Sequence, residues 1–137
     1  MGLIVRTYLD SAPVIYAVEQ TPGFSSLVDE HLTATDAVLV ARDLTRMECR
    51  VKPLRDNDTD LLGDYERFFE EALNECVSLS RRVLDLATEI RARYGFKTPD
   101  SIHLAAAVIN DCDRFLTNDR RLERFRDIAI DVIQAKS

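Results

Sequence analysis

Four acidic residues in this chain could do chemistry together: Asp10, Glu48, Asp100 and Asp119. Three of them, Asp10, Asp100 and Asp119, stand where a predicted strand or loop meets a predicted helix. Because converging carboxylates repel one another, such a cluster is typical of a site that binds a hard cation through oxygen ligands. The first hypothesis is therefore a metal-dependent chemistry on phosphodiester bonds.

Each of these acids also has an ordinary structural explanation. Asp10 and Asp100 could cap helices, Asp119 could be the polar end of a turn, and Glu48 could pair with an arginine. We favour one shared site over four separate coincidences at the same edge of a sheet.

The elements that must position these acids alternate between strands and helices. Predicted strands cover residues 3–9, 37–40, 114–118 and 128–133, with 77–79 as either a brief strand or an extended entry into the next helix. Predicted helices cover residues 11–19, 24–32, 42–54, 60–73, 80–94, 102–109, which Pro99 and Asp100 open, and 121–125. This alternation implies βαβ units and hence an α/β fold, with a mostly parallel sheet between helices.

The topology predicts how the acids meet. Ligands of open parallel sheets bind outside the carboxyl ends of the strands, and Asp10 and Asp119 each follow a predicted strand. Asp100 begins a helix, whose dipole favours an ionised side chain. Glu48 lies four residues after Leu44 and so borders the apolar stripe of its helix, where an unpaired carboxylate is costly. A shared cation would remove that cost.

Composition indicates one domain covering residues 1–137. The chain has 137 residues, 46% of them hydrophobic, which is enough for a sizeable core. Its three cysteines are widely spaced, without a metal-binding pattern, and are expected to be reduced thiols of a cytoplasmic protein. No apolar run approaches the roughly 20 residues of a membrane span, and no signal sequence is recognisable. We expect no membrane association.

The charge distribution is uneven. A net charge of −6 argues against the broad basic surface of a nonspecific nucleic-acid-binding protein. Basic residues nevertheless gather within residues 42–55 and directly after Asp119. They are either solvated helix faces or groups that bind substrate phosphates.

Four segments match a known family in order and spacing: residues 8–11 (YLDS), 45–48 (TRME), 98–107 (TPDSIHLAAA) and 115–119 (FLTND). They resemble the PIN domain and, within it, the VapC-type toxins of bacterial toxin–antitoxin pairs. The resemblance covers essentially the whole chain. It implies a three-layer α/β/α sandwich with a parallel sheet of four or five strands.

The resemblance also implies a Mg²⁺- or Mn²⁺-dependent endoribonuclease. The family's acidic quartet falls on Asp10, Glu48, Asp100 and Asp119, which would be both catalytic and metal-binding. We expect the first three to hold the principal ion, and Asp119 to bind it through water or to help a second ion. Supporting roles are expected for Ser11, Thr117 and Asn118. The candidate RNA-binding residues are Arg42, Arg46, Arg50, Arg120 and Arg121.

The partners implied by the resemblance are an RNA substrate, a VapB-like antitoxin and a second copy of the chain in a homodimer. Other aromatic and imidazole groups are expected to pack: Tyr8, Tyr16 and Phe24 in the core, and His103 within an apolar helix, because a metal-activated water needs no imidazole base.

Two other classes of protein remain as alternatives. The first is a noncatalytic PIN-like module whose acidic pocket docks a partner protein. The second is a receiver or haloacid-dehalogenase-type phosphotransfer domain, which also has an aspartate after its first strand. Against the second, no further aspartate follows Asp10 two residues on, and no lysine follows the late strand.

Overall fold

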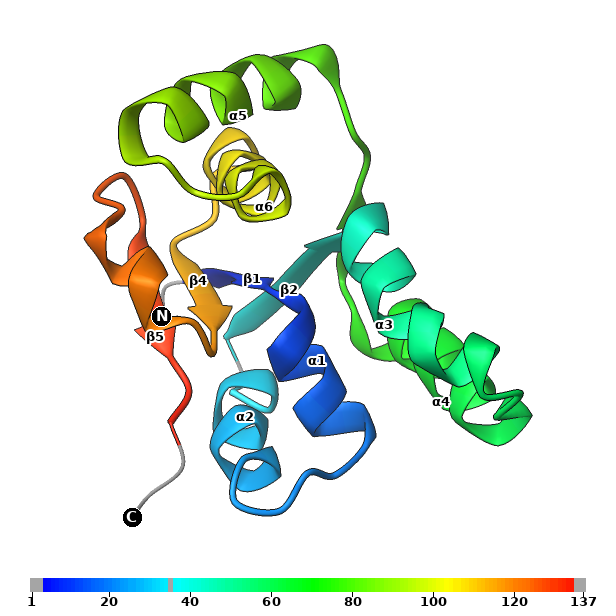
Figure 1. Ribbon diagram of the computed structural model, residues 1–137. Coiled ribbons are helices and arrows are strands. Elements are labelled where there is room, and N and C mark those ends of the chain that lie inside the picture. The colour runs from blue at the N-terminus through cyan, green and yellow to red at the C-terminus, as the bar shows by residue number, and fades with distance from the viewer. Residues whose placement is uncertain (1–3, 35, 135–137) are drawn as a thin grey trace.

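The computed structural model describes residues 4–34 and 36–134. Within them, five strands form one sheet in the order β3-β2-β1-β4-β5, and every neighbouring pair is parallel (Figure 1). The strands are β1 (Val5–Leu9), β2 (Ala37–Arg42), β3 (Glu75–Val77), β4 (Arg114–Thr117) and β5 (Ala129–Val132). Strand β1 is therefore central, with its carboxyl end beside the carboxyl ends of β2 and β4.

Helices connect the strands. They are α1 (Ser11–Val18), α2 (Ser25–Leu32), α3 (Asp43–Arg55), α4 (Thr59–Arg67), α5 (Arg81–Tyr94) and α6 (Thr98–Ile109). Helix α4 continues as a π-helical turn, η1 (Phe68–Ala72), and a 3-10 turn, η2 (Arg120–Arg124), follows β4. Gly95 ends α5 with a φ of +77°, a left-handed conformation that glycine adopts without strain.

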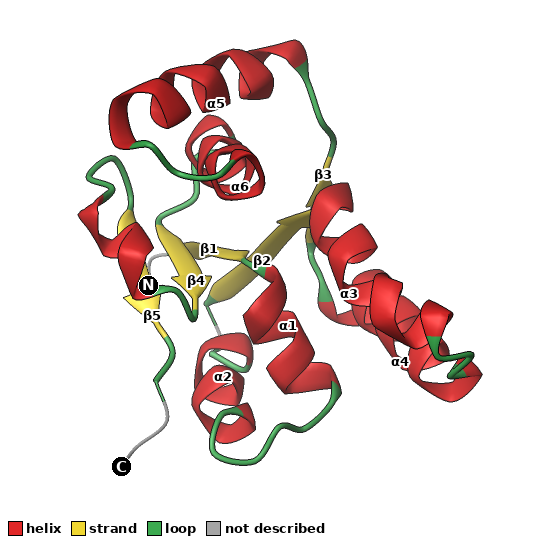
Figure 2. Ribbon diagram, in the orientation of Figure 1, coloured by secondary structure: helices red, strands yellow, loops and turns green. Residues whose placement is uncertain are grey.

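The helices cover both faces of the sheet. Helices α5 and α6 lie on one face, whereas α1 and α2 lie on the other, and α3 and α4 form a hairpin beside β2 (Figures 1 and 2). Successive strand residues point to opposite faces. Accordingly, Tyr8 and Val40 pack in the core under α5 and α6, while Leu9 and Leu39 pack in the core of the other face. The predicted α/β/α sandwich is confirmed.

Several element boundaries differ from the sequence predictions, most of them by one or two residues. Helix α6 begins at Thr98, one residue before the predicted opening at Pro99 and Asp100, and Pro99 lies in its first turn, where the missing N–H is not needed. Strand β3 covers residues 75–77 rather than 77–79. Its start is fixed by Asn74, which exchanges hydrogen bonds with the Leu39 backbone. The predicted helix 60–73 changes to a π-helical turn after Arg67. The predicted start of the first strand, Leu3, lies outside the described residues.

The state of the cysteines and the length of the helices also bear on the sequence predictions. Cys49, Cys76 and Cys112 are all free thiols, as predicted. No described helix is long and apolar enough to cross a membrane.

Candidate active site at the carboxyl edge of the sheet

Two aspartates stand side by side where the central strands end. Asp10 directly follows β1 and caps α1, and its Oδ1 accepts a hydrogen bond from the Ser11 backbone N–H at 2.8 Å. Asp119 follows β4 and caps η2. Thr117 connects the two: its hydroxyl donates to Asp10 Oδ2 at 2.8 Å and accepts from the Asp119 backbone N–H at 3.1 Å. The end of β4 therefore fixes the orientation of Asp10.

Asp100 faces these two aspartates from the first turn of α6. It is half-buried, and burial raises the pKa of its carboxyl group above the ordinary value of 3.8. Repulsion from Asp10 and Asp119 raises this pKa further, while His103 and Arg121 oppose the rise. Asp10 and Asp119 are thus close enough to Asp100 for their charges to affect it.

Glu48, on α3, is connected to the site by a hydrogen bond to His103. His103 on α6 lies 2.7 Å from Glu48 Oε1 and 3.9 Å from Asp10 Oδ1, measured from its Nε2 atom in both cases. His103 is buried, with 1% of its surface exposed. One imidazole therefore lies between the carboxylates of β1 and α3.

Basic side chains surround the outer part of the site. Arg121 forms a bidentate ion pair with Asp119: Nε donates to Oδ1 at 2.9 Å and Nη2 donates to Oδ2 at 2.7 Å. This pairing holds the pKa of Asp119 below its ordinary value. A cavity of about 160 Å³ opens here; its lining includes Lys97, Asp100, Asp119, Arg121 and Arg124. The lining of this cavity therefore combines cationic and acidic side chains.

The donor chemistry fits a hard cation such as Mg²⁺ or Mn²⁺. Four carboxylates lie at one edge of the sheet, and the pKa of Asp100 is raised first by burial and then by repulsion from Asp10 and Asp119, a cost that a bound cation would lower. In residues 4–34 and 36–134, however, no three side chains of His, Cys, Asp or Glu form a ready metal-binding group. Glu48 is hydrogen-bonded to His103, and Asp119 is hydrogen-bonded to Arg121. The four residues that could hold a metal would therefore have to draw closer around it.

Comparison with known families identifies the architecture. A model of the PIN domain matches residues 7–128. The chain belongs to the PIN domain family. No curated protein sequence matches this PIN domain.

Solved structures share the fold of this PIN domain at low sequence identity. VapBC2 from Rickettsia felis, bound to a DNA fragment from its promoter, has a TM-score of 0.77 and 13% identity, covering 95% of this chain and 100% of its own. A toxin–antitoxin complex from Klebsiella pneumoniae has a TM-score of 0.71 and 17% identity, with coverages of 90% and 95%. VapC20 from Mycobacterium tuberculosis, a toxin that cleaves the sarcin–ricin loop, has a TM-score of 0.67 and 8% identity, with coverages of 80% and 86%.

The three supporting residues occupy different positions in this PIN domain. Thr117 orients Asp10, as described above. Ser11 contributes its backbone N–H to Asp10. The Asn118 amide donates to the Tyr16 hydroxyl at 2.9 Å rather than to a carboxylate.

One candidate RNA-binding residue was wrongly assigned. Arg42 is only 2% exposed, so its side chain cannot lie on an RNA-binding surface. It is the last residue of β2, with α3 beginning directly after it, and its Nε and Nη1 have no hydrogen-bond partner among the described residues.

The other four arginines reach the surface. Arg46 and Arg50 are half-buried on α3 and line one groove with Met47, and Arg50 lies 3.9 Å from Glu66. Arg120 and Arg121 are exposed on η2, where Arg120 pairs with Glu123 at 3.5 Å. These four remain candidates for phosphate contacts.

Sequence reasoning missed the polar role of two buried residues. His103 does pack within α6, and Tyr8 is fully buried, as predicted. They also touch each other, because the Tyr8 hydroxyl lies 2.8 Å from His103 Nδ1. The only hint in the sequence was that His103 lies three residues after Asp100, on the same side of the helix.

The raised pKa of Asp100 predicts a pH-dependent stability effect. Because the folded protein binds this proton more tightly than the unfolded chain, stability falls as pH rises from about 3.8 through the raised pKa. Ionised Asp100 thus destabilises the metal-free protein at neutral pH. We expect Asp100→Asn to raise Tm at neutral pH in EDTA, and the gain to shrink as pH falls toward 3.8.

Thermal unfolding monitored by circular dichroism across this pH range checks the prediction. Asp85→Asn, which changes an exposed acid of α5, is the matched control and should show no such gain. A lower Tm for Asp100→Asn at neutral pH would contradict the cost of burial and repulsion described for the ionised Asp100 carboxylate.

Proposed function

We propose that this PIN domain is a Mg²⁺- or Mn²⁺-dependent endoribonuclease that acts as the toxin of a toxin–antitoxin pair. The observation that carries the proposal is the gathering of Asp10, Asp100 and Asp119, with Glu48 joined through His103, at the carboxyl edge of the sheet. The fold neighbours support it, since they include toxin–antitoxin complexes and an RNA-cleaving toxin.

The roles of the side chains follow from their positions. Asp10, Glu48 and Asp100 would hold the principal ion, with Asp119 assisting. Thr117 keeps one Asp10 oxygen fixed by its hydrogen bond and leaves the charge of the carboxylate available. A bound divalent cation supplies charge neutralisation at the scissile phosphate and lowers the pKa of a coordinated water. Hydrolysis would leave a 5′-phosphate and a 3′-hydroxyl.

Sequencing of cellular RNA ends after induced expression tests this proposal. We expect new 5′-phosphate ends at defined sites with the wild-type protein and none with Asp10→Asn. The same ends in both cultures would show that another nuclease makes them.

Arginines near the site would position the RNA backbone in an otherwise acidic protein. Arg46 is half-buried on the same helix as Glu48. We expect Arg46→Ala to weaken RNA binding several-fold and to lower the slope of log affinity against log salt by about one unit, because each phosphate contact releases about one counterion. Fluorescence anisotropy with labelled RNA at several salt concentrations measures both.

The matched control is Arg82→Ala, which removes an exposed arginine of α5 on the outer layer. It should leave affinity and salt slope unchanged. Equal effects of the two variants would assign the binding to overall charge rather than to the α3 groove.

A noncatalytic docking module is the second candidate function. The pairing of Arg121 with Asp119 favours it, because this acidic site already accepts a guanidinium group. Isothermal titration with Mn²⁺ separates the two functions, since a docking module need not bind metal.

The proposed protein partners are a VapB-like antitoxin and a second copy of the chain. Met47, Val51 and Leu54 recur on one side of α3 and are 51–62% exposed, which leaves an apolar stripe for a protein to cover. Co-expression with the product of a neighbouring reading frame, followed by size-exclusion chromatography, tests for both complexes.

A further inference from the structure

The buried imidazole of His103 makes a hydrogen bond at each nitrogen. Its Nε2 lies 2.7 Å from Glu48 Oε1, and its Nδ1 lies 2.8 Å from the Tyr8 hydroxyl. Both contacts join distant parts of the chain, since His103 lies 55 residues after Glu48 and 95 after Tyr8. One side chain of α6 thus connects the central strand β1 with helix α3.

The chemistry of the three groups fixes the direction of these bonds. An ionised carboxylate can only accept, so the hydrogen atom must be on His103 Nε2. When the ring is neutral, Nδ1 is an acceptor, and the Tyr8 hydroxyl donates to it. The chain of donors therefore runs from Tyr8 to His103 and from His103 to Glu48.

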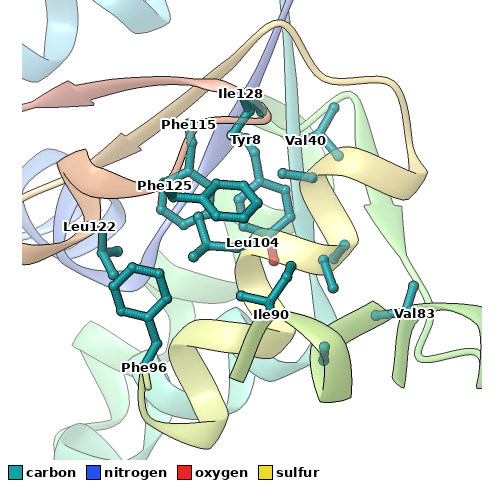
Figure 3. Close-up of a cluster of buried hydrophobic side chains, with 14 residues drawn as sticks. Tyr8, Val40, Val83, Ile90, Phe96, Leu104, Phe115, Leu122, Phe125 and Ile128 are labelled. Atoms are coloured by element: carbon teal, nitrogen blue, oxygen red, sulfur yellow. The ribbon is translucent and has the colours of Figure 1, made fainter. Parts of the chain in front are cut away.

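The start of this chain of hydrogen bonds is held by the core. Tyr8 is fully buried and stacks on Phe115, with ring centroids 5.2 Å apart and an interplanar angle of 9°. Figure 3 shows the two rings beside Leu104 and Phe125. Tyr8 can hardly move, and so the ring of His103 is held in one position.

The same bonds exclude a direct role for the imidazole. With hydrogen on Nε2 and Nδ1 occupied by Tyr8, no free lone pair faces the carboxylates, either for a metal or for the proton of a water molecule. Glu48, by contrast, has 29% of its side chain exposed on α3. Without its bond to His103 it could adopt several rotamers.

We propose that His103 is a positioning residue that holds the Glu48 carboxylate in place for metal binding, and that Tyr8 holds the imidazole in the tautomer this requires. Outer partners of this kind orient ligands in many metal sites. The inference rests on the proposed metal-dependent function, because it gives Glu48 the role of a ligand.

Isothermal titration of the purified proteins with Mn²⁺ alone tests the inference without relying on catalysis. We expect His103→Leu, which keeps the bulk but removes both hydrogen bonds, to weaken Mn²⁺ binding about 10- to 100-fold. His103→Gln places an amide donor near the position of Nε2 and should recover most of the loss. Tyr8→Phe keeps the stacked ring, removes only the hydroxyl, and should weaken binding by a smaller factor.

The matched control is His31→Leu, which changes the other histidine of the chain, on α2, and should bind Mn²⁺ as the wild type does. Wild-type affinity in both His103→Leu and Tyr8→Phe would overturn the positioning role, and so would equal weakening by His103→Gln and His103→Leu. If His103→Leu does not fold, the test rests on Tyr8→Phe, and wild-type Mn²⁺ affinity in that variant would overturn the positioning role. A wild-type protein that binds no Mn²⁺ would instead contradict the proposed function, and the inference with it.

Discussion

Asp10→Asn is expected to lower the rate of metal-dependent RNA cleavage by at least about 100-fold, because a metal ligand is asked to supply several kcal/mol of stabilisation. Asp10 has the most central position in the site, with Thr117 on one oxygen and His103 Nε2 3.9 Å from the other. Asparagine has the same shape but no charge. Since asparagine is also a good N-cap, α1 should keep its start and the protein its fold.

Cleavage of a labelled RNA in Mn²⁺, together with circular dichroism, measures activity and fold for the same samples. Asp85→Asn makes the same chemical change on an exposed surface of α5 and should cleave as the wild type does. If Asp10→Asn and Asp85→Asn cleaved equally well, Asp10 would not be a metal ligand.

Leu104→Ala is expected to have the largest effect on stability, a loss of about 2–5 kcal/mol. Leu104 is fully buried on α6 and belongs to the core between this helix and the sheet. Figure 3 shows it surrounded by Tyr8, Phe125 and Ile90. Truncation leaves a cavity that the rigid β1–β4 pair cannot fill, and a loss of about 3 kcal/mol corresponds to roughly 10 °C in Tm for a domain of this size.

Urea denaturation provides the free energy of unfolding for this comparison. Leu79→Ala is the matched control, since Leu79 is 52% exposed between β3 and α5 and its truncation should change stability by less than about 0.5 kcal/mol. Similar losses for the two variants would mean that the core between α6 and the sheet is not packed as described.

The sequence predicted those parts of the site that depend on local signals. Asp10 and Asp119 were placed correctly at one edge because each follows an apolar strand, and parallel neighbours end on the same side. Asp100 follows Pro99, whose position at a helix start is also a local property. These inferences needed only the order of the elements.

Burial and long-range contacts were harder to predict. Arg42 was predicted to be a surface charge, but it is the last residue of β2 and its side chain is buried. In a strand, a shift of one residue along the chain moves a side chain to the opposite face of the sheet. The bonds of His103 to Glu48 and Tyr8 span 55 and 95 residues, so no local pattern reveals them. The apolar neighbours of His103 predicted its burial and nothing of its partners.

The central claim is that four carboxylates bind a metal with which this PIN domain cleaves RNA. Incubation of the purified wild-type protein with labelled RNA, in Mn²⁺ and in EDTA, tests it most directly. We predict cleavage to fragments with 5′-phosphate ends in Mn²⁺ and none in EDTA. Cleavage that continues unchanged in EDTA, or intact RNA under both conditions with a folded protein freed of any antitoxin, would contradict the claim.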